Sequence, residues 1–144
     1  MRAVFFDLDG TLLNQKHELS SITIEAVERL KQRGIIVCLA SGRTSLSMRP
    51  FYQQLKLTSP LVSYNGARII FSDTDIDESS LPPHIVTQLI ELAHEHDIHL
   101  NLYENELWYV ENAKSFTTTE YAAIAHLEPH QVNFNQLKGQ SMTK

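Results

Sequence analysis

The sequence contains a single cysteine, no long apolar run and no excess of positive charge. The lone thiol, Cys38, excludes an intrachain disulfide, and its place in the run IIVCLA predicts a buried, reduced side chain. No apolar stretch approaches the length that spans a bilayer, and the acidic motif at the seventh residue is not typical of a signal peptide, so we expect a cytoplasmic protein. A formal net charge of -5 favours neither nucleic acid nor an anionic membrane as a partner.

What the chain does contain is ordinary for a folded protein. Hydrophobic residues make up 42% and charged residues 20% of its 144 positions, which is enough to bury a substantial core. A polar, acidic stretch, FSDTDIDESSL, interrupts the apolar segments and predicts a connector or a small hairpin. We place a domain boundary there, between a first domain over residues 1–80 and a second over residues 81–144.

The first domain opens on AVFFDLDGTLL, residues 3–13. Apolar β-forming residues run directly into Asp7 and Asp9, and a Gly-Thr pair then interrupts the strand. In a parallel sheet this places both carboxylates at the carboxyl end of a buried strand, where ligands bind. Residues i and i+2 of an extended chain share a face, so both can address one site. Their mutual repulsion requires a cation or a shared proton, and Mg²⁺ is the cation that we expect.

The segments that follow predict a βαβ unit. SSITIEAVERLKQRG begins with Ser20 or Ser21 as the N-cap of an amphipathic helix. The expected apolar face of that helix consists of Ile22, Ala26, Val27 and Leu30. Residues 35–40 form a continuous apolar run, as in a strand that is covered on both faces. A helix over residues 45–55 follows, and LVSYNGARII then predicts a third strand with a turn or bulge at Asn65-Gly66.

The second domain predicts helices and short strands. Two consecutive prolines, Pro82 and Pro83, open a helix. Its expected apolar face consists of Ile85, Leu89, Leu92 and Ala93. Two short strands are expected about a turn at residues 104–106, and a further helix begins at a Ser/Thr cap in SFTTTEYAAIAHL. The tail EPHQVNFNQLKGQSMTK has no strong periodicity and is expected to stop without closing a recognisable unit.

Three motifs together carry a family resemblance: DLDGTLL, LASGR at residues 39–43 and YNGA at residues 64–67. The chain resembles the haloacid-dehalogenase superfamily, and more narrowly the Cof-type phosphatases with a large α/β cap. The resemblance covers nearly the whole chain but only the first half of such a protein. It implies an α/β fold with a partial Rossmann-like parallel-sheet core, holding the first three strands, and an incomplete α+β cap.

The resemblance also implies roles for particular residues. Asp7 is the nucleophile that forms an aspartyl-phosphate, and Asp9 is the general acid and then the general base. Mg²⁺ contacts an Asp7 oxygen and the backbone carbonyl of Asp9. The phosphate is held by the backbone N–H groups of Leu8 and Gly42 and by the Ser41 hydroxyl.

Two further residues belong to the expected site. Arg43 either clamps the same anion or supports the loop, and Asn65 lines the site in a supporting role. The predicted activity is Mg²⁺-dependent hydrolysis of small phosphorylated metabolites, such as sugar phosphates or nucleotides.

Two of the four catalytic motifs of the family have no counterpart in this chain, so we expect weak activity or none. A non-catalytic phosphate-binding or interaction module therefore stays open as an alternative. The strand that carries Asp7 is also expected to leave an open sheet edge, which predicts self-association.

Overall fold

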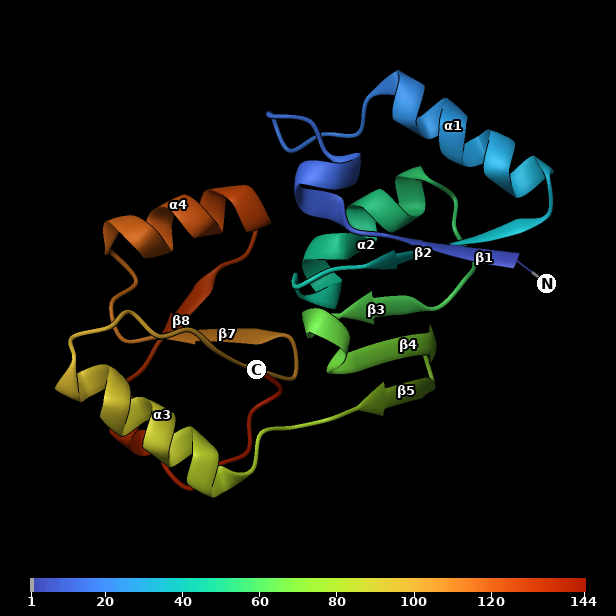
Figure 1. Cartoon of the computed structure of the whole chain (residues 1–144). Coiled ribbons are helices and arrows are strands. Elements are labelled where there is room, and N and C mark those ends of the chain that lie inside the picture. Colours follow the sequence, from blue (N-terminus) through green and yellow to red (C-terminus); the bar gives the residue numbers. More distant parts are fainter. Residues whose placement is uncertain (1) are drawn as a thin grey trace. The chain divides into compact units, whose positions relative to one another are not determined.

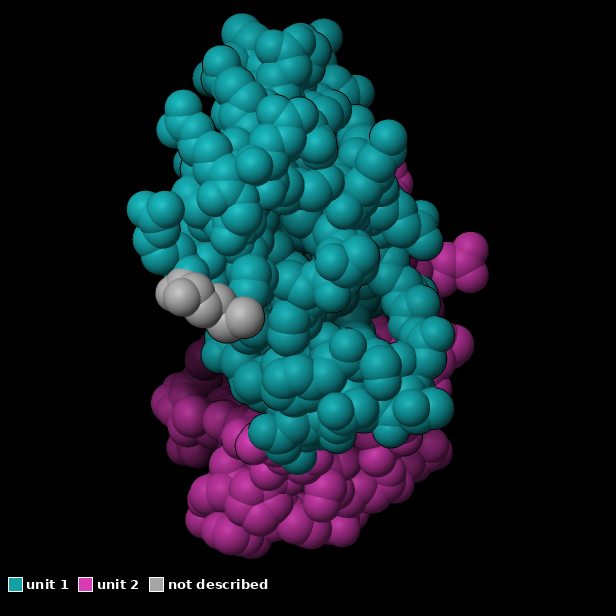
Figure 2. All heavy atoms as spheres, turned by 90° about the vertical axis from the view of Figure 1, so that its right-hand side faces the viewer, with its two compact units in different colours: residues 1–78 teal, residues 79–144 magenta. Residues whose placement is uncertain are grey.

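The computed structural model describes residues 2–144, which form a mixed α/β chain of two compact units. The first unit ends at Glu78 and the second begins at Ser79; Figure 2 shows them in different colours. None of the helices in residues 2–144 has the length and apolar character needed to cross a membrane. The α/β fold class expected from the sequence is confirmed.

The first unit is built on a five-stranded sheet with the order β1-β2-β3-β4-β5 (Figure 1). Its strands are β1 (Arg2–Phe6), β2 (Ile35–Ala40), β3 (Leu61–Ser63), β4 (Arg68–Ser72) and β5 (Asp75–Glu78). The first three strands run parallel, so their carboxyl ends lie at one edge of the sheet. The last two run antiparallel, and β4 with β5 forms the small hairpin that the acidic stretch allowed.

Two helices complete this unit, α1 (Ser21–Gln32) and α2 (Ser45–Gln54). Ser20 is the N-cap of α1, and its hydroxyl accepts a hydrogen bond from the Thr23 N–H at 3.1 Å. Val27 is 2% exposed in the core, but Ile22 is 76% exposed, so its expected place in the apolar face is wrong. Five residues turn an α-helix by about 140° beyond a full turn, which carries Ile22 away from the side that Val27 buries.

The third segment of the sheet divides into two strands instead of one. A tight turn over Tyr64–Gly66 separates β3 from β4, and all three residues have positive φ, at 52°, 58° and 94°. Asparagine and glycine tolerate this left-handed conformation best, which is why the chain can reverse at Asn65-Gly66.

The second unit contains α3 (Pro83–Glu95), β6 (Leu102–Glu104), β7 (Leu107–Val110), α4 (Phe116–Ala125) and β8 (Pro129–Gln131). Its sheet has the order β6-β7-β8 (Figure 1), with β8 parallel to β7. Trp108 is 1% exposed and packs edge-to-face on Tyr121, with the ring centroids 5.1 Å apart.

Two expectations for this unit are wrong. The buried face of α3 consists of Val86, Ile90 and Ala93, of which only Ala93 was expected, and the expected Leu92 is 49% exposed. The tail also forms structure, because it supplies β8 and then closes onto the unit's beginning through the Leu81 N–H, which donates to the Met142 carbonyl at 2.7 Å. This pairing joins residues 61 positions apart and has no local sequence signal.

Candidate active site

A wide helical turn follows Asp7 and contains Asp9. The strand ends at Phe6, and the N–H of Leu13 donates to the Leu8 carbonyl at 2.9 Å to close a turn over Leu8–Leu12. Leu8 is fully buried, which fixes this turn to the core. Asp7 and Asp9 keep extended dihedral angles (φ -75°, ψ 161° and φ -74°, ψ 122°), but Leu8 between them belongs to the turn, so the two aspartates do not follow one another along a regular strand as expected.

Asp7 lines a cavity at the carboxyl ends of the parallel strands. The cavity has a volume of about 420 Å³. Its lining consists of Asp7, Ala40, Ser41, Gly42, Val62, Asn65 and Gly66. Four of the residues expected at the site thus meet at one edge of the sheet, a carboxylate among hydroxyl, amide and backbone groups. Leu8, Asp9 and Arg43 are not part of this lining.

Two loops interlock beside this cavity. The N–H of Ser41 donates to the Val62 carbonyl at 3.0 Å, and the N–H of Asn65 donates back to the Ser41 carbonyl at 3.0 Å. The Asn65 side chain then lies directly over Gly42, where an added Cβ would come within 2.8 Å of its Oδ1. An alanine at position 42 would therefore push the Asn65 side chain aside.

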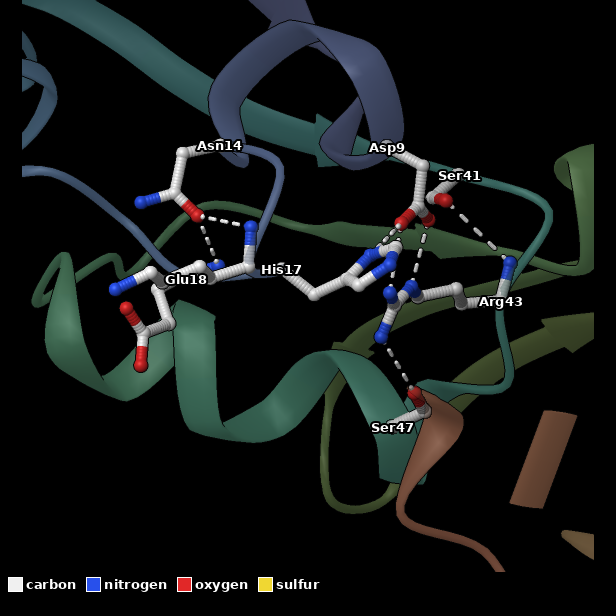
Figure 3. A network of polar contacts seen from close by, with 8 residues as sticks. Asp9, Asn14, His17, Glu18, Ser41, Arg43 and Ser47 are labelled. Carbon is white, nitrogen blue, oxygen red and sulfur yellow. Dashed lines mark hydrogen bonds and ion pairs between the residues drawn. The ribbon is translucent and has the colours of Figure 1, made fainter. Parts of the chain in front are cut away.

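Asp9 is held by a buried arginine. Arg43 Nε donates to Oδ2 and Arg43 Nη2 donates to Oδ1 of Asp9, both at 2.7 Å (Figure 3). The Arg43 side chain is only 6% exposed; its Nη1 donates to Ser47 Oγ at 3.2 Å, and its guanidinium lies 5.5 Å from the Phe51 ring centroid. Both oxygens of Asp9 are therefore engaged in a two-pronged, charge-assisted contact.

This contact sets the charge state of Asp9. The hydrogen bonds and positive charge of Arg43 hold the pKa of the Asp9 carboxyl below its ordinary value, against an opposing effect of burial, with a smaller contribution from His17. The Asp9 carboxyl is therefore ionised near neutral pH. His17, whose Nδ1 lies 3.4 Å from Asp9 Oδ1, was not among the predicted site residues. A lone histidine in a polar loop gives no local signal of such a contact.

The donor set can be compared with the needs of a metal ion. Within residues 2–144 no three His, Cys, Asp or Glu side chains gather closely enough to hold a metal. Mg²⁺ typically takes one or two carboxylates and keeps several waters, so a larger protein cage is not required. The Asp7 carboxylate lines the cavity. Both oxygens of the Asp9 side chain accept hydrogen bonds from Arg43, and Asp9 does not line the cavity.

Comparison with known proteins identifies the family. The model of the haloacid dehalogenase-like hydrolases matches residues 4–144. The chain belongs to the haloacid dehalogenase-like hydrolase family, as its three motifs indicated.

Individual relatives and structures agree with this assignment. The 5-amino-6-(5-phospho-D-ribitylamino)uracil phosphatase YitU of Bacillus subtilis is 36% identical over 104 residues, 70% of this chain and 38% of that protein. The pyridoxal phosphate phosphatase YbhA of Escherichia coli is 34% identical over 113 residues, 77% of this chain and 42% of that protein. A haloacid dehalogenase-like hydrolase from Bacteroides thetaiotaomicron superposes with a TM-score of 0.78 at 29% identity, covering 92% of this chain and 52% of that one. The chain thus spans two fifths to half of the length of these proteins.

Proposed function

We propose that this chain belongs to a Mg²⁺-dependent phosphatase that hydrolyses small phosphorylated metabolites through an aspartyl-phosphate on Asp7. The observation that carries the proposal is the cavity of about 420 Å³, which Asp7 lines together with Ser41, Gly42 and Asn65. Relatives named as phosphatases of a phosphoribityl compound and of pyridoxal phosphate support the substrate class.

In the proposed reaction, an Asp7 oxygen attacks phosphorus and the bond from phosphorus to the leaving oxygen breaks. Asp9 gives its proton to the leaving oxygen, and later takes a proton from the water that attacks the phosphorus of the aspartyl-phosphate. Phosphate is released and Asp7 is regenerated. The Ser41 hydroxyl and the Gly42 N–H donate to the phosphoryl oxygens.

Mg²⁺ bound to the Asp7 carboxylate and the Asp9 main-chain carbonyl would supply positive charge against the phosphoryl oxygens.

The environment of Asp9 bears on these two proton transfers. Arg43 favours the ionised carboxylate, which is the form that accepts a proton from water. The first step needs the protonated form. A bound substrate favours that form, because it removes water from the half-exposed Asp9 side chain and adds negative charge beside it.

The test is an assay of the purified chain with Mg²⁺ and p-nitrophenyl phosphate or pyridoxal phosphate. Asp7→Asn should lower turnover by about a thousandfold or more, because the nucleophile is lost. Asp73→Asn, at the exposed turn between β4 and β5, is the matched control and should leave turnover unchanged. Turnover that survives Asp7→Asn would contradict the proposed mechanism. Binding of inorganic phosphate and Mg²⁺ without turnover would instead support the non-catalytic module.

A further inference from the structure

A short hairpin after the Asp9 turn presents His17. Leu13 and Leu19, both buried, pair across its base, and the Asn14 N–H donates to the Glu18 carbonyl at 3.0 Å. Asn14 Oδ1 accepts hydrogen bonds from the N–H groups of Lys16 and Glu18, at 2.8 and 3.1 Å (Figure 3). The hairpin is therefore anchored in the core and closed by a side chain at its tip.

His17 sits in this hairpin at a backbone position that histidine does not favour. Its φ is +57°, and its N–H donates to the Asn14 carbonyl at 2.9 Å. A left-handed residue other than glycine or asparagine costs about 1 kcal/mol. The imidazole that this conformation presents points toward the Asp9 carboxylate (Figure 3).

The contacts at Asp9 are asymmetric. Oδ1 receives Arg43 Nη2 at 2.7 Å and faces His17 Nδ1 at 3.4 Å, whereas Oδ2 receives only Arg43 Nε from within residues 2–144. Each carboxylate oxygen has two acceptor positions. Oδ1 thus has the Arg43 hydrogen bond and the nearby His17 imidazole, whereas Oδ2 has the Arg43 hydrogen bond.

We propose that His17 is a positioning residue that covers Oδ1 of Asp9 and so directs Oδ2 toward the incoming ligand. The carboxylate accepts only, so His17 Nδ1 carries the proton in this contact. Arg43 alone fixes the plane of the carboxylate but leaves an acceptor position on both oxygens. The His17 imidazole, which is 44% exposed, covers the acceptor position on Oδ1 from the solvent side. The expected effect of His17 on turnover rests on the proposed function. The contact between His17 and Asp9 rests on geometry alone.

The test compares substitutions that differ in where a donor lies. Asparagine places its Nδ2 close to the position of the histidine Nδ1 and also tolerates positive φ, whereas leucine has no donor and glutamine reaches too far. With Mg²⁺ and p-nitrophenyl phosphate at fixed pH, His17→Leu and His17→Gln should lower kcat about tenfold with KM nearly unchanged, because Asp9 is misplaced. His17→Asn should retain kcat. Lys16→Gln, on the same hairpin, is the control.

A second readout does not depend on turnover. The side-chain carboxyl ¹³C resonance of Asp9 should move in His17→Leu, return toward its original position in His17→Asn and stay in place in Lys16→Gln. Thermal denaturation of each variant checks that the fold is retained. Equal kcat and equal Asp9 resonances in the leucine and asparagine variants would overturn the inference. An inactive wild-type chain would favour the non-catalytic module, and the resonance comparison would then decide the role of His17 by itself.

Discussion

The contact between Arg43 and Asp9 can be tested by its contribution to stability. Arg43→Met removes both hydrogen bonds to Asp9 while an unbranched apolar side chain of similar length fills the space. A hydrogen bond to a charged group contributes about 1.5–3 kcal/mol when buried, and an exposed ion pair contributes about 0–1 kcal/mol. Arg43 is buried, but the Asp9 side chain is 44% exposed and is screened by water. We therefore expect a loss of about 1–2 kcal/mol in the free energy of unfolding.

A double-mutant cycle separates this pair from other effects of the substitution. Urea unfolding of the wild type, Arg43→Met, Asp9→Asn and the double variant should give a coupling energy of about 1 kcal/mol. Arg49→Met, on an exposed position of α2, is the control and should change stability by less than about 0.5 kcal/mol.

The same pair predicts a pH dependence. Arg43 holds the pKa of the Asp9 carboxyl below its ordinary value of 3.8. The folded state therefore binds the Asp9 proton more weakly than the unfolded state, and the stabilisation is present above pH 3.8 and lost as the pH falls through the lowered pKa. The difference in stability between wild type and Arg43→Met should be constant near neutral pH and shrink below about pH 4. A coupling energy near zero would contradict a stabilising contact between Arg43 and Asp9. A stability difference between wild type and Arg43→Met that does not change in acid would contradict the lowered pKa of Asp9.

Two further predictions follow from the loops and the sheet edge. Gly42→Ala would place a Cβ 2.8 Å from Asn65 Oδ1, so it should displace the Asn65 side chain and lower both thermal stability and phosphate affinity. Adding Asn65→Gly should restore the thermal stability but not the phosphate affinity. An alanine variant as stable as the wild type would contradict the close contact between the two loops. Within the described residues β1 pairs only with β2, and Phe5 on it is 61% exposed, so the chain should associate with rising concentration in sedimentation and Phe5→Lys should weaken this. A wild-type chain that stays monomeric at all concentrations would contradict it.

Much of the fold could be predicted because its signals are local. The hydroxyl at Ser20 and the pair Pro82-Pro83 mark helix starts by their own chemistry, and the structure begins helices at Ser21 and Pro83. The apolar run at residues 35–40 is long enough to be a strand wherever it lies. These features depend on a few neighbouring residues, so sequence reasoning can find them.

Other features depend on what a segment packs against. The choice of Val86, Ile90 and Ala93 as the buried face of α3 is made by the tail, which brings Phe134 and Met142 onto this helix. Both possible faces of α3 are apolar in the sequence, and periodicity cannot choose between them without the partner. The tail was missed for the same reason, because its pairing partners lie far away in the chain.

The site also contains one part that could be predicted from the sequence and one part that could not. Parallel strands bring their carboxyl ends to one edge, so the meeting of Asp7, Ser41, Gly42 and Asn65 follows from strand order and could be predicted. The position of Asp9 could not. It depends on the turn over Leu8–Leu12, in which Gly10 has a φ of 73°.

That turn gives two neighbouring carboxylates different surroundings. Asp7 stays open to the cavity, while Asp9 is turned onto a buried guanidinium and an imidazole that restrict its rotation. For the proposed reaction this division is useful, because a nucleophile must be reached by phosphorus whereas a proton donor must be aimed at one oxygen. The turn that begins at Leu8 therefore gives two like charges, two residues apart, different surroundings.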